Sequence, residues 1–206
     1  NGVETNVKPV TQWDPTQYCN MWTVRFGGAD AGTLGYAQFP NNSGLAGLGA
    51  NNGAANTDGV VGSFSSFGSS DIYPSGTYAA PYDKGRTMTH EVGHWLGLRH
   101  IWGDGGCTVD DYCADTPTSD AANYGCPAGH TSCGTTDMIE NYMDYTDDDC
   151  MNMFTNDQKT RIQTVMSVCP RRMELATSTA CTPLVADDAG ISAVSNPNGD
   201  YCNISS

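Results

Sequence analysis

The sequence predicts an α+β domain with two lobes, and three observations support this class. Short segments rich in β-forming residues alternate with Gly-rich turns over residues 18–67, as in a small sheet. Helical periodicity begins only later, at residues 84–96 and from residue 155. Residues 98–154 follow neither periodicity and are rich in cysteine and aspartate. We therefore expect an N-terminal subdomain at 1–97, a loop-rich C-terminal subdomain at 98–176, and a linker with the start of a following module at 177–206.

Three segments of the first half are expected to form strands. Residues 18–26 (YCNMWTVRF) are dense in β-forming residues, and residues 34–39 (LGYAQF) end at Pro40. Residues 59–67 (GVVGSFSSF) follow a long loop of Gly, Asn, Ala and Ser.

Two segments are expected to be helical. The first covers residues 84–96, with Asp83 as a candidate N-cap and Gly97 as the C-terminal stop. The second opens at Thr155, whose spacing to Gln158 matches a capping box. Apolar residues follow at core spacing until a proline ends the helix.

The charge of the chain excludes one class of partner. The formal net charge is -14 at pH 7, and residues 104–149 contain ten Asp and one Glu but no Lys or Arg. Nucleic acid is therefore excluded as a partner, because its phosphates require basic surfaces. The acidic stretch is consistent with a solvated surface, with bound cations or with a basic substrate. No apolar run is long enough to span a membrane. We expect the protein to be a monomer.

Nine cysteines indicate an oxidising compartment. Six of them lie between residues 107 and 169, and no CxxC pair is present, so disulfides are a better interpretation than a structural zinc ribbon. Because nine is odd, at least one thiol is free or pairs outside the chain. Cys181 and Cys202 could pair within the final segment. We expect a secreted protein, and the first residue, Asn1, suggests a processed form or an excised piece of a longer precursor.

Residues 90–100 (HEVGHWLGLRH) contain three of the four histidines. On a helix His90 and His94 lie one turn apart on the same face, so both imidazoles can reach one ion. If the helix continued, His100 would lie about 15 Å from His90 along the axis and about 80° off that face. Gly97 resolves this, because glycine can adopt a positive φ and turn the chain back. The three imidazoles predict a catalytic zinc site with one open position.

Glu91 completes the predicted chemistry. It follows the first histidine but points about 100° away from it around the helix, so it need not bind the metal. Zinc lowers the pKa of a bound water to about 7, and a carboxylate can then take the proton of that water. The alternative is a helix with surface histidines, but a motif that fixes five positions is far more specific than HExxH alone.

The motif HExxHxxGxxH resembles that of the metzincin zinc peptidases, and further segments are similar to the pappalysin (cytophagalysin) branch of that class. These segments lie between about residues 13 and 170: GYAQFP (35–40), TDGVV (57–61), KGRTMTHEVGHWLGLRHIWGDGGC (84–107), ADTP (114–117), GCP (125–127) and ENYMDYTDDDCMNMFT (140–155). The resemblance implies a metzincin-type fold with a twisted sheet, an active-site helix and a loop-rich lower lobe. It also implies zinc endopeptidase activity. Compared with the family, the portion before Trp13 is short.

The resemblance implies roles for three residues in the acidic half. Met143 lies 43 residues past His100, where the family has a methionine turn beneath the metal. Tyr145 resembles the family tyrosine that steadies the oxyanion. Asp148 falls where some pappalysins have an acid in the pocket for the residue after the scissile bond, which would favour Arg or Lys there. The alternative is that residues 147–149 are simply solvated.

Residues 34–39 resemble the edge strand that roofs the metzincin cleft. Such an edge pairs with an extended peptide through main-chain hydrogen bonds. Tyr36, Ala37 and Gln38 are therefore expected to contact a polypeptide substrate, and a small ester is not expected.

The resemblance further implies two disulfides, Cys107 with Cys133 and Cys126 with Cys150. Closing loops of about 25 residues would stabilise the fold by roughly 3 kcal/mol each. Cys113 and Cys169 have no assigned partner. Cys19, which falls in a predicted strand, is interpreted as a buried free thiol.

Calcium is also expected from the resemblance. The oxygen-rich residues Asp110, Asp111, Asp115 and Thr116 are the candidate ligands, helped by the main-chain carbonyl of Cys113. The fourth histidine, His130, is interpreted as an exposed loop residue that binds no metal.

The sequence thus predicts a secreted zinc endopeptidase that cleaves polypeptides. The competing interpretation is a zinc- and calcium-containing domain that binds peptides without cleaving them, or an inactive piece of a protease. Glu91 favours the enzyme, because a pure binding site needs no carboxylate base beside the first ligand.

Overall fold

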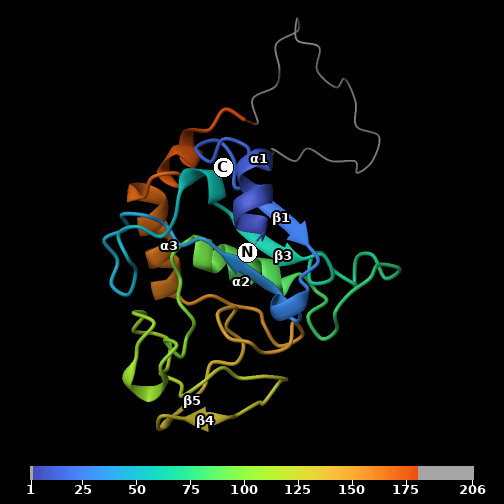
Figure 1. Ribbon diagram of the computed structural model, residues 1–206. Helices are drawn as coiled ribbons and strands as arrows, with labels where there is room; N and C mark the ends of the chain where they lie inside the picture. The colour runs from blue at the N-terminus through green and yellow to red at the C-terminus, as the bar shows by residue number, and fades with distance from the viewer. Residues whose placement is uncertain (1, 181–206) are drawn as a thin grey trace, which may run out of the picture.

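A three-stranded sheet forms the N-terminal layer of the computed structural model, which describes residues 2–180 (Figure 1). The strands are β1 (Met21–Val24), β2 (Gly35–Ala37) and β3 (Val60–Ser63), in the order β1-β3-β2. The central strand β3 is parallel to β1 and antiparallel to β2. All three predicted strands are confirmed, but each is shorter than its pattern, because the β-forming residues extend beyond the paired stretch.

The helix α2 (Arg86–Trp95) packs on one face of this sheet. Val60, Met88 and Trp95 form the buried core between the two layers. A Cβ added to Gly62 in β3 would lie 2.5 Å from the sulfur of Met88, so the helix approaches the strand closely only because Gly62 has no side chain.

The short segment before Trp13 covers the opposite face. It contains a π-helical turn η1 (Val3–Val7) and a short helix α1 (Lys8–Thr11). Trp22 and Tyr36 both lie opposite Val61 in the strand register, and the buried ammonium of Lys8 lies over their rings, at 5.3 and 4.8 Å. The ammonium also donates to the main-chain oxygen of Thr57 at 3.1 Å.

The start of α2 differs from the prediction. Asp83 was wrong as the N-cap: the cap is Gly85, with φ 81°, and the Asp83 carboxylate accepts a hydrogen bond from Ser70. The main-chain N–H groups at this end are held instead by Asp148, which accepts from Lys84 at 2.7 Å and from Arg86 at 3.2 Å. A distant carboxylate takes the role because helix N-termini attract negative charge.

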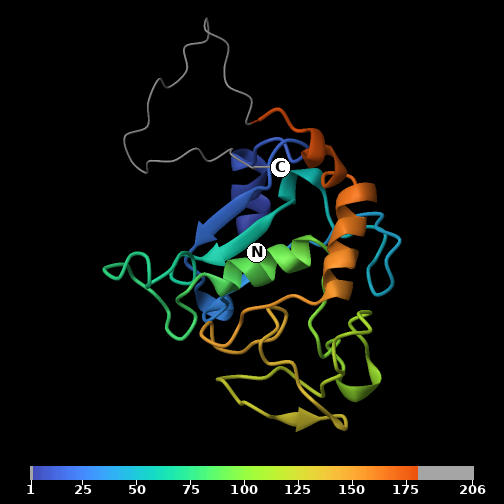
Figure 2. The same cartoon turned by 180° about the vertical axis from the view of Figure 1, so that it is seen from behind.

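The second long helix, α3 (Asn156–Val168), is as predicted. Thr155 and Gln158 form a reciprocal capping box, so the expected start is confirmed. Figure 1 and Figure 2 show that the sheet and the loop-rich lower part lie on opposite sides of α2. The remaining elements are η2 (Gly28–Asp30), η3 (Ala55–Thr57), η4 (Gly106–Thr108), η5 (Met173–Thr177) and the small hairpin of β4 (Thr131–Ser132) and β5 (Thr135–Thr136).

Two disulfides hold the lower loops. Cys107 is bonded to Cys133 and Cys126 to Cys150, which confirms both expected pairs. Cys19, Cys113 and Cys169 are free. Cys19 lies just before β1 and is half-buried, so its placement inside a strand was wrong, and burial raises the pKa of its thiol to about 11.

Two further expectations concern the chain as a whole. Cys181 and Cys202, and most of the predicted linker and following module, lie outside the described residues. Within residues 2–180, no helix combines the length and the apolar character that crossing a membrane requires.

Candidate active site

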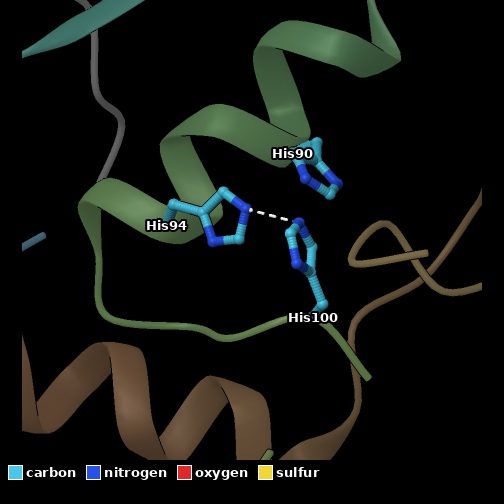
Figure 3. A group of neighbouring side chains, drawn as sticks. All are labelled: His90, His94 and His100. Atoms are coloured by element: carbon cyan, nitrogen blue, oxygen red, sulfur yellow. Dashed lines mark hydrogen bonds between the residues drawn. The ribbon is translucent and has the colours of Figure 1, made fainter. Parts of the chain in front are cut away.

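Three histidines converge where α2 ends (Figure 3). His90 and His94 lie on the last turns of α2, and Gly97 has φ 91°, so the chain turns back and brings His100 beside them. One donor atom from each of the three lies within 4.8 Å of the others. The helix spacing and the glycine turn thus act as the sequence predicts.

Each imidazole is oriented by a partner on its outer nitrogen. The Nδ1 atoms of His90 and His94 face main-chain oxygens, which can only accept, and Nδ1 of His100 faces a carboxylate. Each Nδ1 therefore carries the proton, and each Nε2 presents a lone pair. The three contacts are His90 to Tyr142 O (2.7 Å), His94 to Leu98 O (2.8 Å) and His100 to Asp104 Oδ1 (2.5 Å).

The inner nitrogens form a site that fits a cation. Nε2 of His94 and Nε2 of His100 lie 3.0 Å apart, and with both protons on the outer nitrogens no proton lies between them. Two facing lone pairs repel unless a positive charge is placed at their meeting point. Burial, followed by the neighbouring histidine charge, lowers the pKa of His94 to about 4 and that of His90 well below its usual value. Three neutral imidazole donors are the ligand set of catalytic zinc sites.

Glu91 lies beside the three histidines, and one oxygen of its carboxyl group, Oε2, has no hydrogen-bond partner among the described residues. Its side chain is buried. Burial raises the pKa of this carboxyl to about 8. A Cβ added to Gly35 would lie 2.8 Å from Oε1, so β2 passes directly over the carboxyl group. The role of Gly35 was missed, because a glycine within a short strand pattern has many explanations.

Met143 packs against the helix that carries His90 and His94. It is completely buried, and a Cβ added to Gly93 would lie 2.5 Å from its sulfur. The main-chain oxygen of Met143 accepts a hydrogen bond from the main-chain N–H of Ile101, one residue after His100. A glycine inside a helical pattern signals such a close approach, so Gly93 could have been found from the sequence.

Tyr145 lies at the open side of the cluster. Its ring centre is 5.5 Å from that of His90 and 4.9 Å from that of His100. Burial, and then the charge of Glu91, raises the pKa of the phenol to about 12. The hydroxyl therefore stays protonated at neutral pH and can act as a hydrogen-bond donor.

A pocket of about 400 Å³ opens beside Glu91 and Tyr145. Its wall combines the segment that leads into β2, the start of α2 and the turn around Met143. The lining residues are Gly32, Thr33, Leu34, Gly35, Tyr82, Arg86, Thr87, His90, Glu91, Tyr124, Asp144, Tyr145, Thr146, Asp148 and Met151.

Asp148 lies in this wall and is 2% exposed, so the interpretation as a solvated acid is wrong for this residue. Burial raises the pKa of its carboxyl. The neighbouring Asp149 does fit that interpretation, since its side chain is 75% exposed. Arg86 lines the same pocket and lies over the ring of Tyr142.

The predicted substrate strand is an edge. β2 pairs with β3 on one side, and no strand of residues 2–180 pairs with its other side. The hydroxyl of Tyr36 donates to Glu4 at 2.7 Å, and the amide of Gln38 contacts Thr57 and Ala54. The main chain around Ala37, more than these side chains, is thus the part that faces outward.

The predicted calcium ligands do not converge in the same way. Among side chains of His, Cys, Asp and Glu in residues 2–180, only the three histidines bring three donor atoms together. Asp110 and Asp115 accept main-chain hydrogen bonds from Tyr112 and Asp157. His130 is 46% exposed, as expected for a loop residue, but it also contacts the buried Asp137 at 3.0 Å.

Asp111 differs from the other acidic residues of this loop. It is 2% exposed, and its Oδ1 accepts from the Thr116 hydroxyl and from the main chain of Cys113. Its Oδ2 has no partner among the described residues. Burial, and to a smaller extent the adjacent Asp110 carboxylate, raises the pKa of Asp111 to about 6.

Arg161 fixes the turn that delivers His100, and no pattern in the sequence indicated this role. Its Nε donates to the main-chain oxygen of Gly97 at 2.7 Å, and its Nη2 donates to that of Ala46 at 2.7 Å. An arginine in the middle of an amphipathic helix is usually exposed, whereas Arg161 is buried.

An α+β domain in which HExxHxxGxxH brings three imidazoles together, and in which a buried methionine packs against the same helix, defines the metzincin class of metallopeptidases. Comparison with known proteins supports this class. The family model Peptidase_M43, described as pregnancy-associated plasma protein-A, matches residues 2–167. The chain therefore belongs to this family, the pappalysin branch of the metzincins.

Several known proteins are similar to this chain. Extracellular metalloprotease 1 of Coccidioides posadasii is 44% identical over 137 residues, which are 65% of this chain and 45% of that protein. An extracellular metalloprotease of Sordaria macrospora is 53% identical over 85 residues, 39% of this chain and 30% of that protein. Mature mirolysin of Tannerella forsythia, solved in complex with a cleaved peptide, has a TM-score of 0.66 at 42% identity and covers 80% of this chain and 58% of that chain. The chain thus spans less than half the length of these two curated relatives.

Proposed function

We propose that this chain is the catalytic part of a secreted zinc endopeptidase that cleaves polypeptides. One observation carries the proposal: three neutral imidazoles direct Nε2 at one point, and beside them Glu91 presents a buried oxygen without a partner. A domain that only bound peptide would have no use for that carboxyl group. Residues 1–97 and 98–176 would act as the two lobes of the catalytic unit.

His90, His94 and His100 are the proposed zinc ligands. When bound in such a site, zinc acts as a Lewis acid and makes water more acidic. Glu91 accepts a proton from the attacking water and later donates it to the leaving amine. Its position beside the three imidazoles suits both steps, because one of its buried oxygens has no hydrogen-bond partner among the described residues. Tyr145 donates its hydroxyl proton to the developing oxyanion in a hydrogen bond.

The substrate is proposed to lie along β2. In an antiparallel strand alternate residues direct their main-chain groups outward, and Leu34 and Gln38 bond to the β3 side. Gly35 and Ala37 therefore offer their main-chain groups to an extended peptide. The cleaved peptide in the mirolysin structure is consistent with this class of substrate.

The pocket that holds Asp148 is proposed to receive the residue after the scissile bond. A carboxylate in a half-enclosed wall favours Arg or Lys there. Arg86 lines the same pocket and contributes positive charge. A preference for Arg or Lys therefore requires that attraction by Asp148 exceeds repulsion by Arg86. Replacing Asp148 by Asn should reduce cleavage before Arg and Lys more than cleavage before apolar residues.

Calcium is proposed at Asp111. Two adjacent carboxylates and a buried oxygen without a hydrogen bond are stabilised by a hard cation. Thr116, Asp110, Asp115 and the Cys113 carbonyl would complete the site after small shifts. A rise in melting temperature on adding calcium, absent in Asp111→Asn, tests this proposal.

An extracellular location is supported by the two disulfides and by the names of the relatives. We propose that the chain acts as a monomer, which sedimentation at several concentrations would test.

The activity is tested by incubating the zinc-loaded chain with a mixed peptide library and mapping the cuts. Glu91→Gln, which keeps the shape of the side chain, and a chelated sample are the controls. We expect cuts only by the wild-type chain with zinc. If the chain bound zinc but cleaved no peptide, the proposed endopeptidase activity would be overturned, and a domain that binds peptides without cleaving them would be favoured.

A further inference from the structure

The third histidine of the site is held differently from the other two. His90 and His94 extend from consecutive turns of α2, and their Nδ1 atoms donate to neutral main-chain oxygens. His100 lies in a loop after the helix, and its Nδ1 faces the carboxylate of Asp104. His100, which lies outside the helix, is thus the one proposed ligand whose Nδ1 faces a charged group.

The backbone around Asp104 has an unusual conformation that directs its carboxylate at His100. Gly103 and Asp104 both have φ 63°, a left-handed conformation that side chains other than Asn and Asp rarely adopt. Gly103 N donates to the main-chain oxygen of His100 at 2.9 Å, so the turn closes directly on the histidine. A Cβ added to Gly103 would lie 2.8 Å from the main-chain carbon of Val109, so no other residue fits there.

Two more side chains fix this arrangement. Arg99 donates to the main-chain oxygen of Gly103 at 2.6 Å, and its guanidinium lies 3.8 Å from Oδ2 of Asp104. The Trp102 ring stacks on His100, with ring centres 4.2 Å apart and planes 5° from parallel. Trp102 fixes the plane of the imidazole, and Asp104 fixes which nitrogen points inward.

We propose that Asp104 is a positioning residue for the metal centre: it locks His100 in the Nδ1–H tautomer and aims Nε2 at the zinc. This inference rests on the proposed zinc site and adds a residue outside its ligands. Without an acceptor at Nδ1, the imidazole would also populate the Nε2–H tautomer, which has no inner lone pair to offer. A carboxylate partner also makes the inner nitrogen a stronger donor.

The test compares three variants of the whole chain for zinc affinity, by competition with a chromophoric chelator. Asp104→Gly removes the carboxylate and tolerates the left-handed backbone, so strain does not confuse the result. Asp104→Asn keeps an acceptor oxygen without the charge. Asn42→Gly is the matched control, because Asn42 also has a positive φ (51°) but lies on an exposed loop.

We expect Asp104→Gly to bind zinc about 10–100-fold more weakly than the wild-type chain, Asp104→Asn to fall between them, and Asn42→Gly to be unchanged. A second readout is the ¹⁵N spectrum of His100 in the zinc-free chain. It should report the Nδ1–H form in the wild type and a mixture of tautomers in Asp104→Gly, which a general loss of stability would not produce.

Equal zinc affinity of Asp104→Gly and wild type, or an unchanged His100 tautomer, would overturn the inference and leave the proposed zinc site intact. Failure of the wild-type chain itself to bind zinc would overturn the proposed function instead. The two failures are therefore distinguishable.

Discussion

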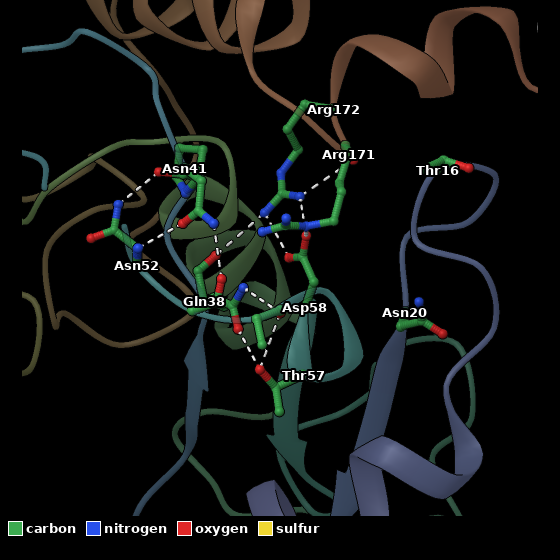
Figure 4. Close-up of polar contacts among 12 residues, drawn as sticks. Thr16, Asn20, Gln38, Asn41, Asn52, Thr57, Asp58, Arg171 and Arg172 are labelled. Carbon is green, nitrogen blue, oxygen red and sulfur yellow. Dashed lines mark hydrogen bonds and ion pairs between the residues drawn. The ribbon is translucent and has the colours of Figure 1, made fainter. Parts of the chain in front are cut away.

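Arg172, in the segment between α3 and η5, and Asp58, just before β3, form a buried ion pair (Figure 4). The two terminal nitrogens of Arg172 donate to the two oxygens of Asp58 at 2.7 and 2.9 Å. Arg172 also lies 3.6 Å from the ring centre of Trp95 and donates to its main-chain oxygen. Arg171 bonds to the same carboxylate. This cluster fixes the position of the active-site helix relative to the sheet.

Replacing Asp58 by Ala should destabilise the chain by about 3–5 kcal/mol, because it leaves buried guanidinium charge without a partner. Urea unfolding followed by tryptophan fluorescence measures the change. Asp30→Ala, an exposed aspartate in η2, should change stability by less than about 0.5 kcal/mol. A similar small effect at Asp58 would mean that the ion pair contributes little.

Gly97→Ala should both destabilise the chain and weaken zinc binding. The added Cβ would lie 2.8 Å from Val165, and φ 91° is strained for any side chain. We expect a loss of more than about 1 kcal/mol together with reduced zinc content. Gly44→Ala is the matched control, since Gly44 also has a positive φ (67°) but open space around it. If the two variants behaved alike, backbone strain alone would explain the effect and the contact with Val165 would not matter.

Asp137 should make the lower lobe sensitive to acid. Burial alone would raise the pKa of its carboxyl, but hydrogen bonds from Ser132, Asn123 and His130 outweigh it and lower the pKa. A lowered pKa in the folded state gives stability that is present above about pH 4 and lost as pH falls through the folded pKa.

The measurement is the unfolding free energy of wild type and Asp137→Asn from pH 7 down to pH 3. The variant should be less stable by about 1–3 kcal/mol at pH 7, and the difference should shrink below pH 4. Asp120→Asn, an exposed acid of the same lobe, should show no such trend. A constant difference at Asp137 would mean that its charge plays no part.

Cys126 and Cys150 are joined by a disulfide and lie 24 positions apart in the sequence. Replacing both cysteines by Ser should cost roughly 3 kcal/mol, because the unfolded chain regains the freedom of that loop. Thermal unfolding would measure it, and the effect should exceed that of Cys169→Ser, whose thiol is free. Equal effects would show that the cross-link adds nothing beyond its side chains.

The sequence predicted the parts of the site that follow local rules. Helix spacing placed His90 and His94 together, and one glycine returned His100 to them. The capping box at Thr155 is likewise local, and it is confirmed. Residues joined by long-range contacts were not predictable: Asp148 lies more than 60 positions from the helix end that it caps, and Arg161 lies 64 positions from Gly97.

Burial of charge is the feature that the sequence left most open. The acidic stretch was consistent with a solvated surface, yet Asp111, Asp137, Asp144 and Asp148 are all less than 5% exposed. Each accepts main-chain hydrogen bonds, from donors close in sequence for Asp111 and Asp137 and from distant donors for Asp144 and Asp148. Only the folded chain places those donors, so composition alone cannot distinguish a buried acid from a surface acid.

X-ray absorption at the zinc edge tests the central claim most directly. The account predicts one zinc per chain, bound by three imidazole nitrogens at about 2.0–2.1 Å, with one imidazole fewer in His100→Ala. Glu91→Gln should give the same three nitrogens as the wild type. No retained zinc, or sulfur ligands at about 2.3 Å from the free cysteines, would contradict the account.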